Sequence, residues 1–111
     1  MATSVAKLKG CVVGEFNKTI ILTCKDLAGT VQNISSYTGT KNVLFRSPKS
    51  NKEVSCTASF TSDGSDGRIS FAFAAGDLSE SGDWVGTVEL RISTTTLTKS
   101  DQFIMEVAQA T

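Results

Sequence analysis

Residues 68–92 read Arg-Ile-Ser-Phe-Ala-Phe-Ala-Ala-Gly-Asp-Leu-Ser-Glu-Ser-Gly-Asp-Trp-Val-Gly-Thr-Val-Glu-Leu-Arg-Ile and carry the strongest local pattern in the chain. Ile69, Phe71 and Phe73 alternate with small or polar residues, which is typical of a strand with one buried face. A second strand follows, and its expected buried face carries Trp84, Val88, Leu90 and Ile92. The pattern predicts two neighbouring strands on which the rest of the chain packs.

The connection between these two strands covers residues 75–82 and is too short for a helix of normal length. It suits a single helical turn that Gly82 closes, and we expect Leu78 to pack into the core from there. This stretch therefore indicates architecture and carries no chemistry of its own.

Alternating apolar residues predict further strands at residues 7–13, 18–25, 41–46, 53–61 and 100–107. Gly10 weakens the first of them and indicates a bulge there. Together these make about seven strands with turn signals about every 8–12 residues, which is the spacing of a β-sandwich. We expect one all-β domain over residues 1–111. Its predicted core consists of Trp84, Phe71, Phe73, Ile20, Leu22, Phe45, Leu90 and Phe103.

The charge balance argues against several classes of partner. Eleven basic and eleven acidic residues cancel without clustering, unlike the basic surface of a nucleic-acid binder or a membrane-surface protein. No apolar run approaches the ~20 residues that span a bilayer. The first residues lack the basic and apolar regions of a signal peptide, so we expect the chain to remain in the cytoplasm where it is made unless a partner carries it out.

The composition also argues against catalysis and metal binding. The chain has no His, which removes Ser–His and Cys–His nucleophile activation and the commonest metal ligand. Cys11, Cys24 and Cys56 match no zinc spacing. Cys24 and Cys56 both fall on inward faces, so we expect reduced cysteines that act as small hydrophobic residues. A Cys24–Cys56 disulfide is the alternative.

Two acidic segments offer further candidate chemistry. Residues 63–67 gather acidic and hydroxyl oxygens but fail the spacing of a calcium-binding EF-hand, so a glycine-rich turn capped by Asp63 is favoured. Asp77, Glu80 and Asp83 could indicate a glycosidase, but nothing places a cleft beside them and solvated corner residues are favoured. We therefore expect no enzyme, no metal and no cofactor.

Trp84 and Tyr37 could form a platform on which sugar rings stack. Trp84 begins a strand whose later residues on the same face are all apolar, so a place in the core is favoured.

A series of short motifs, in this order, carries a family resemblance: Val13-Gly14-Glu15, Thr19 to Thr23, the turn Asp26 to Gly29, Val43-Leu44-Phe45 with Ser47-Pro48, Asp66 to Ile69, Asp77-Leu78, Gly82-Asp83-Trp84, and Lys99 to Phe103 with Val107. Over nearly its whole length the chain resembles the immunoglobulin-like N-terminal domain of tailed-phage baseplate upper proteins and of related small phage virion proteins.

The resemblance implies an immunoglobulin-like antiparallel β-sandwich of about seven strands. It also implies a non-enzymatic structural protein of a tailed-phage virion, made in the cytoplasm of the bacterial host. Its partners would be the major capsid protein or a tail or baseplate protein in a symmetric multi-copy assembly, with capsid decoration and a tail accessory role about equally expected. The alternative is a module that recognises host-surface glycans or a receptor, which an exposed aromatic pair in a groove would favour.

The threonine-rich connection after the second central strand is the candidate docking site. Its main chain could pair with a neighbouring protein as a free strand edge, or it could be an ordinary hairpin connection. The residues concerned are Ser93, Thr94, Thr95, Thr96, Leu97 and Thr98.

Overall fold

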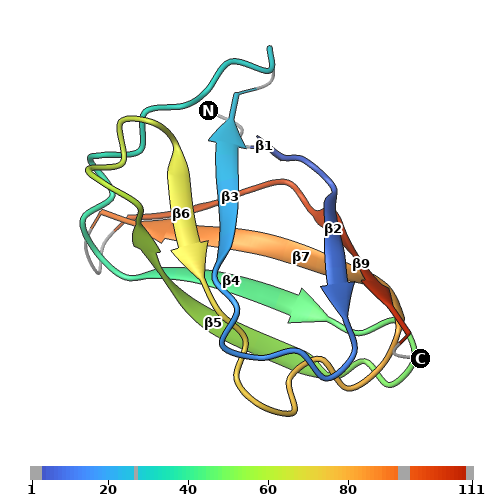
Figure 1. The fold of residues 1–111 in the computed structure, drawn as a ribbon. Helices are drawn as coiled ribbons and strands as arrows, with labels where there is room; N and C mark the ends of the chain where they lie inside the picture. Colours follow the sequence, from blue (N-terminus) through green and yellow to red (C-terminus); the bar gives the residue numbers. More distant parts are fainter. Residues whose placement is uncertain (1–3, 27, 93–95, 110–111) are drawn as a thin grey trace.

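The computed structural model describes residues 4–26, 28–92 and 96–109, and these form nine strands and no helix (Figure 1). The all-β class is therefore confirmed. The strands are β1 (Ser4–Val5), β2 (Leu8–Val12), β3 (Ile20–Lys25), β4 (Lys41–Arg46), β5 (Glu53–Phe60), β6 (Arg68–Phe71), β7 (Gly82–Arg91), β8 (Leu97–Lys99) and β9 (Phe103–Ala108).

The strands build one curled sheet in the order β1-β3-β6-β5-β4-β7-β9-β2, with β8 on β7. Its first half, β1-β3-β6, lies across the second half in Figure 1, where β3 and β6 cross in front of β4 and β7. Strand β5 joins the halves: residues 53–58 pair with β4, and Ser59 and Phe60 pair with β6. The inward side chains of both halves meet between them and form the core.

The sheet is mixed, which corrects the expectation of a purely antiparallel arrangement. Strand β2 runs parallel to β9, with Leu8 opposite Met105 and Cys11 opposite Val107. The first expected strand is in fact two, because residues 4–5 pair with β3 before the chain crosses to β9. The bulge expected at Gly10 is confirmed: the register shifts between Leu8 and Cys11, and Gly10 has a φ of 90°.

The connection over residues 75–82 is a set of turns, so the expected helical turn was wrong. Asp77 closes it locally: its N–H donates to the carbonyl of Ala74, and its carboxylate accepts the N–H of Ala74. This local pair, one backbone bond and one side chain–backbone bond, replaces a helical hydrogen bond pattern. Leu78 nevertheless packs into the core as expected.

The eight residues predicted for the core are all buried. The ring of Phe45 on β4 lies 5.7 Å from Phe71, 5.2 Å from Phe73 and 5.8 Å from Phe103, measured between centroids. Such tilted and edge-on pairs stabilise beyond their buried area. Ile92 was also expected on the buried face, but β7 ends at Arg91 and Ile92 is 43% exposed.

Trp84 should be the costliest single truncation in this core. It is fully buried, and its indole N–H donates to the carbonyl of Glu80 at 3.1 Å. We expect Trp84→Ala to lower the free energy of unfolding by about 3–5 kcal/mol, as measured by chemical denaturation. A change below about 1 kcal/mol would contradict a core role for this ring.

The three cysteines are free and buried. Burial raises the pKa of the Cys24 and Cys56 thiols to about 11, so little reactive thiolate forms near neutral pH. We expect a reducing agent to leave the Tm unchanged in calorimetry. A disulfide would contribute about 2–4 kcal/mol, so a clear drop in Tm on reduction would show that a bridge forms.

Candidate functional site

The predicted docking connection is described only in its second half. Ser93, Thr94 and Thr95 lie outside the described residues. Beyond them the chain returns along β7, with the Ile92 N–H donating to the carbonyl of Thr96 at 3.2 Å and Leu97 opposite Arg91. The described half is therefore one arm of a hairpin, and it also lies at an edge of the sheet.

The direction of the main-chain groups in β8 follows from its hydrogen bonds. The carbonyl of Thr96 accepts a bond from β7, and the N–H of Ser100 donates to the carbonyl of Val88 at 2.9 Å. Because these directions alternate along an antiparallel pair, the N–H and C=O groups of Leu97 and Lys99 face away from β7. Among the described strands only β7 pairs with β8, so this edge is open.

Exposed apolar side chains flank this edge. Leu97 is 41% exposed and Ile92 is 43% exposed, on the two arms of the same hairpin. An open edge with apolar side chains is a template for pairing with another chain.

A neighbouring segment holds the hairpin in place. The hydroxyls of Tyr37 and Thr98 are hydrogen bonded at 3.3 Å, and the N–H of Gly39 donates to the carbonyl of Arg91 at 2.9 Å. Lys41 donates to the carbonyls of Tyr37 and Gly39 from a position 4.2 Å above the ring of Phe60. These contacts fix the base of the hairpin before any partner binds.

A second candidate surface is an open groove of about 770 Å³ on the outer face of β5, β4 and β7. Its floor holds the half-buried side chains of Leu44 and Val85. The side chains that line it from outward positions are Leu44, Arg46, Glu53, Ser55, Val85, Thr87, Lys99 and Gln102.

A β-bulge forms one wall of the groove. Glu89 lies opposite Lys99, whereas Gly86 lies opposite Phe103, so the segment that runs from β8 into β9 carries one more residue than β7 over this interval. The extra residue changes the alternation of side chains. Lys99 before the bulge and Gln102 after it both contribute to the groove.

The charges at the groove are paired. Arg46 contacts Glu53 at 2.8 Å at one end, and Lys99 contacts Glu89 at 3.4 Å at the other. The Arg46–Glu53 pair is exposed on both sides and contributes little stability. The two pairs leave the groove without a net charge.

Sequence reasoning missed this groove. The sequence does place two apolar residues, Leu44 and Val85, at outward positions of their strands, where polar residues are usual. Alternation alone does not show that the two residues lie on neighbouring strands.

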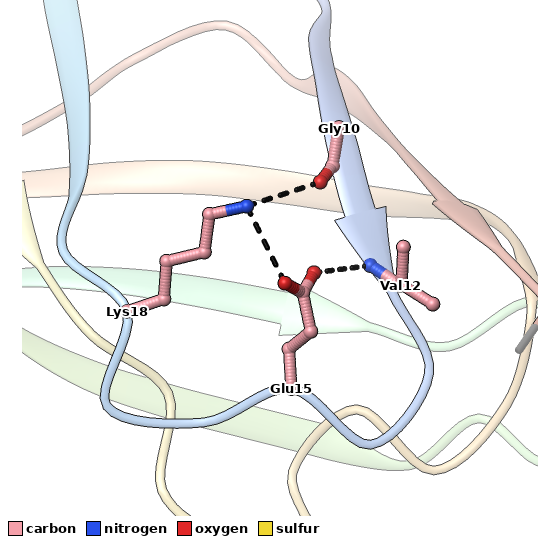
Figure 2. Close-up of polar contacts among 4 residues, drawn as sticks. All are labelled: Gly10, Val12, Glu15 and Lys18. Atoms are coloured by element: carbon pink, nitrogen blue, oxygen red, sulfur yellow. Dashed lines mark hydrogen bonds and ion pairs between the residues drawn. The ribbon is translucent and has the colours of Figure 1, made fainter.

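Figure 2 shows a third cluster of polar contacts, between β2 and β3. The carboxylate of Glu15 accepts the N–H of Val12 at 2.7 Å, and Lys18 reaches both Glu15 at 3.4 Å and the carbonyl of Gly10 at 3.3 Å. The cavity beside it measures about 10 Å³, room for about one water molecule. This cluster closes a turn and leaves no space for a ligand.

The acidic side chains of the two candidate segments make hydrogen bonds that stabilise turns. Asp63 accepts both the N–H and the hydroxyl of Ser65, which lowers the pKa of its carboxyl, and the interpretation as a self-capped turn is confirmed. Asp77 binds Ala74, and Glu80 accepts the hydroxyl of Ser50 in the β4–β5 turn. In the described part of the chain no three acidic or cysteine side chains gather as a metal site.

Trp84 and Tyr37, the alternative candidates for a sugar-stacking platform, are not exposed together. Trp84 is fully buried, which confirms its place in the core, and Tyr37 is partly buried with its hydroxyl bonded to Thr98. Phe16 is 54% exposed, but the other exposed large apolar residues that the structure describes are aliphatic.

Glu80 should make stability depend on pH. The Ser50 hydroxyl is the main cause of its lowered pKa, and partial burial opposes that shift. A lowered pKa means that Glu80 stabilises the fold fully above its unfolded pKa, about 4.3, and loses this contribution as the pH falls through the folded pKa. We expect Glu80→Gln to lower the Tm at pH 7.

The difference in Tm between the original chain and Glu80→Gln should shrink as the pH falls below about 4. The exposed Glu53→Gln is the control variant, since it removes a carboxylate from the β4–β5 hairpin to which Ser50 belongs. An equal effect of both substitutions at every pH would contradict the role of Glu80.

No helix in the described residues is long and apolar enough to cross a membrane. In comparisons with known proteins, neither a family model nor a curated protein matches this chain.

Proposed function

We propose that this chain is a non-enzymatic structural protein of a tailed-phage virion that docks on other virion proteins. The ordered motifs described above supply the phage assignment. The observation that carries the docking role is the open edge of β8, where the main-chain groups of Leu97 and Lys99 face away from β7. An extended segment of a partner can add to such an edge as a further strand.

The finer fold in this proposal is an immunoglobulin-like β-sandwich. Its two layers would be β1-β3-β6 and β4-β7-β9-β2, with β5 pairing with both. The contacts of Phe45 on β4 with Phe71 on β6 support this assignment, because they join the inner faces of the two halves.

In this proposal, the partner is recognised by the shape of the surface and by main-chain hydrogen bonds. The chain has no net charge, and the charged side chains around the groove are already paired with each other. Long-range electrostatic attraction therefore contributes little to partner binding. Capsid decoration and a place in the baseplate or tail fit this mode of docking equally well.

Recognition of host glycans is the competing role. Sugar-binding sites use exposed aromatic rings, and the two rings that were the candidates for one, Trp84 and Tyr37, are buried and partly buried here. This observation favours protein partners over glycans.

Co-sedimentation with particles assembled without this chain tests the proposal. We expect the purified protein to bind such capsids or tails at a fixed symmetric stoichiometry, with an affinity that moderate salt changes little. Whole host cells and purified glycans are the controls. Binding to cells or glycans with no binding to particles would contradict a structural role.

A proline on β8 tests the docking edge. The main chain of Thr96 faces β7, so a proline there would disturb the hairpin itself. Leu97→Pro instead removes an N–H that faces outward, which an edge strand tolerates. We expect Leu97→Pro to weaken particle binding about tenfold or more, whereas Leu97→Val and the rim change Lys49→Glu should have small effects. Equal binding by all three variants would exclude docking through this edge.

A further inference from the structure

The outer-face groove has the composition of a site for a polypeptide segment. Leu44 lies opposite Ser55 on one neighbouring strand and opposite Thr87 on the other, so two hydroxyl groups flank an apolar side chain. Val85 continues the apolar floor along β7. An apolar centre with a few convergent polar groups is typical of binding grooves.

The polar groups of this groove are available to a ligand. The side chains of Ser55, Thr87 and Gln102 make no hydrogen bond with other residues that the structure describes. Ser100 differs, because its hydroxyl is occupied by the N–H of Val88 and the carbonyl of Asp101, both at 2.9 Å. Three free donor or acceptor side chains therefore surround the apolar floor.

The size of the groove matches a short extended segment. A strand residue occupies roughly 160 Å³, from a rise of ~3.3 Å, a strand spacing of ~4.8 Å and a sheet spacing of ~10 Å. The volume of about 770 Å³ would therefore hold about five residues.

The charges of the groove select an uncharged occupant. The cations Arg46 and Lys99 already contact Glu53 and Glu89, so a charged ligand would meet no unpaired opposite charge. The aromatic ring of the lining belongs to Phe45, which is only 2% exposed and cannot stack on a sugar. Both features favour a neutral peptide over an anion, a cation or a glycan.

We infer that this groove binds an extended, uncharged segment of another virion protein, with a valine, leucine or isoleucine side chain placed against Leu44 and Val85. The main chain of the segment is held by Ser55, Thr87 and Gln102. The inference rests on the proposed function for the identity of the partner, and it adds a second contact surface to the edge of β8.

Short overlapping peptides that cover the other structural proteins of the particle are the probes for this site. Titration of the ¹⁵N-labelled chain should identify a peptide that shifts the amide signals of Leu44, Ser55 and Thr87. We expect Ser55→Arg to raise the Kd of that peptide at least tenfold, because the exposed Ser55 side chain can be enlarged without disturbing the core. Leu44→Asn is the second variant, with its fold verified by thermal melting.

Ser59→Arg is the matched control, since Ser59 is an exposed serine on the same strand but outside the groove. It should leave the Kd unchanged. The inference is overturned if no peptide binds, if the shifts fall on β8 instead, or if Ser55→Arg binds as well as the original chain. The proposed function is tested separately by the co-sedimentation experiment, and it fails if the original chain does not bind particles there.

Discussion

The contact on which the arrangement depends is the packing of Phe103 against the backbone of Gly86. A Cβ atom at Gly86 would lie 2.5 Å from the ring of Phe103, so only glycine lets β9 place this ring against β7. Phe103 then meets Phe45 edge-on, and Phe45 in turn contacts Phe71 and Phe73 from the other half of the sheet. These ring contacts join the two halves of the curled sheet, because Phe45 and Phe103 lie on one half and Phe71 lies on the other.

Packing of the inward faces in the core determines which surfaces remain available to partners. The inward faces of β3, β4, β6, β7 and β9 are used by the core, so any docking must use outward faces or strand edges. Strand β2 covers the edge of β9 by parallel pairing but does not reach β8. Strand β8 therefore leaves an open edge in addition to those of the terminal strands β1 and β2, and this edge lies beside the groove.

The two candidate surfaces share residues and can act together. Lys99 belongs to the edge through its main chain and to the groove through its side chain. The base of the hairpin is fixed by Tyr37 and Gly39, so a partner would meet an ordered edge and lose little entropy on binding. Docking of this kind suits a protein with no net charge, because its specificity comes from shape and main-chain hydrogen bonds.

The sequence by itself determined the all-β class, the inward face of most strands and the turn closed by Asp63. These depend on alternation and on side chain–backbone bonds between close neighbours, which the order of residues contains. The burial of Trp84, Cys24 and Cys56 was predictable from the same alternation.

Only the tertiary structure decided which strands pair. A period of two assigns a residue to a face but carries no information about the partner strand, so the parallel pairing of Leu8 with Met105 could not be predicted. The groove depends on the same long-range pairing, because it forms where Leu44 meets Ser55 and Thr87 from two other strands. Which main-chain groups of β8 face outward was likewise decided by the hydrogen bonds between β8 and β7.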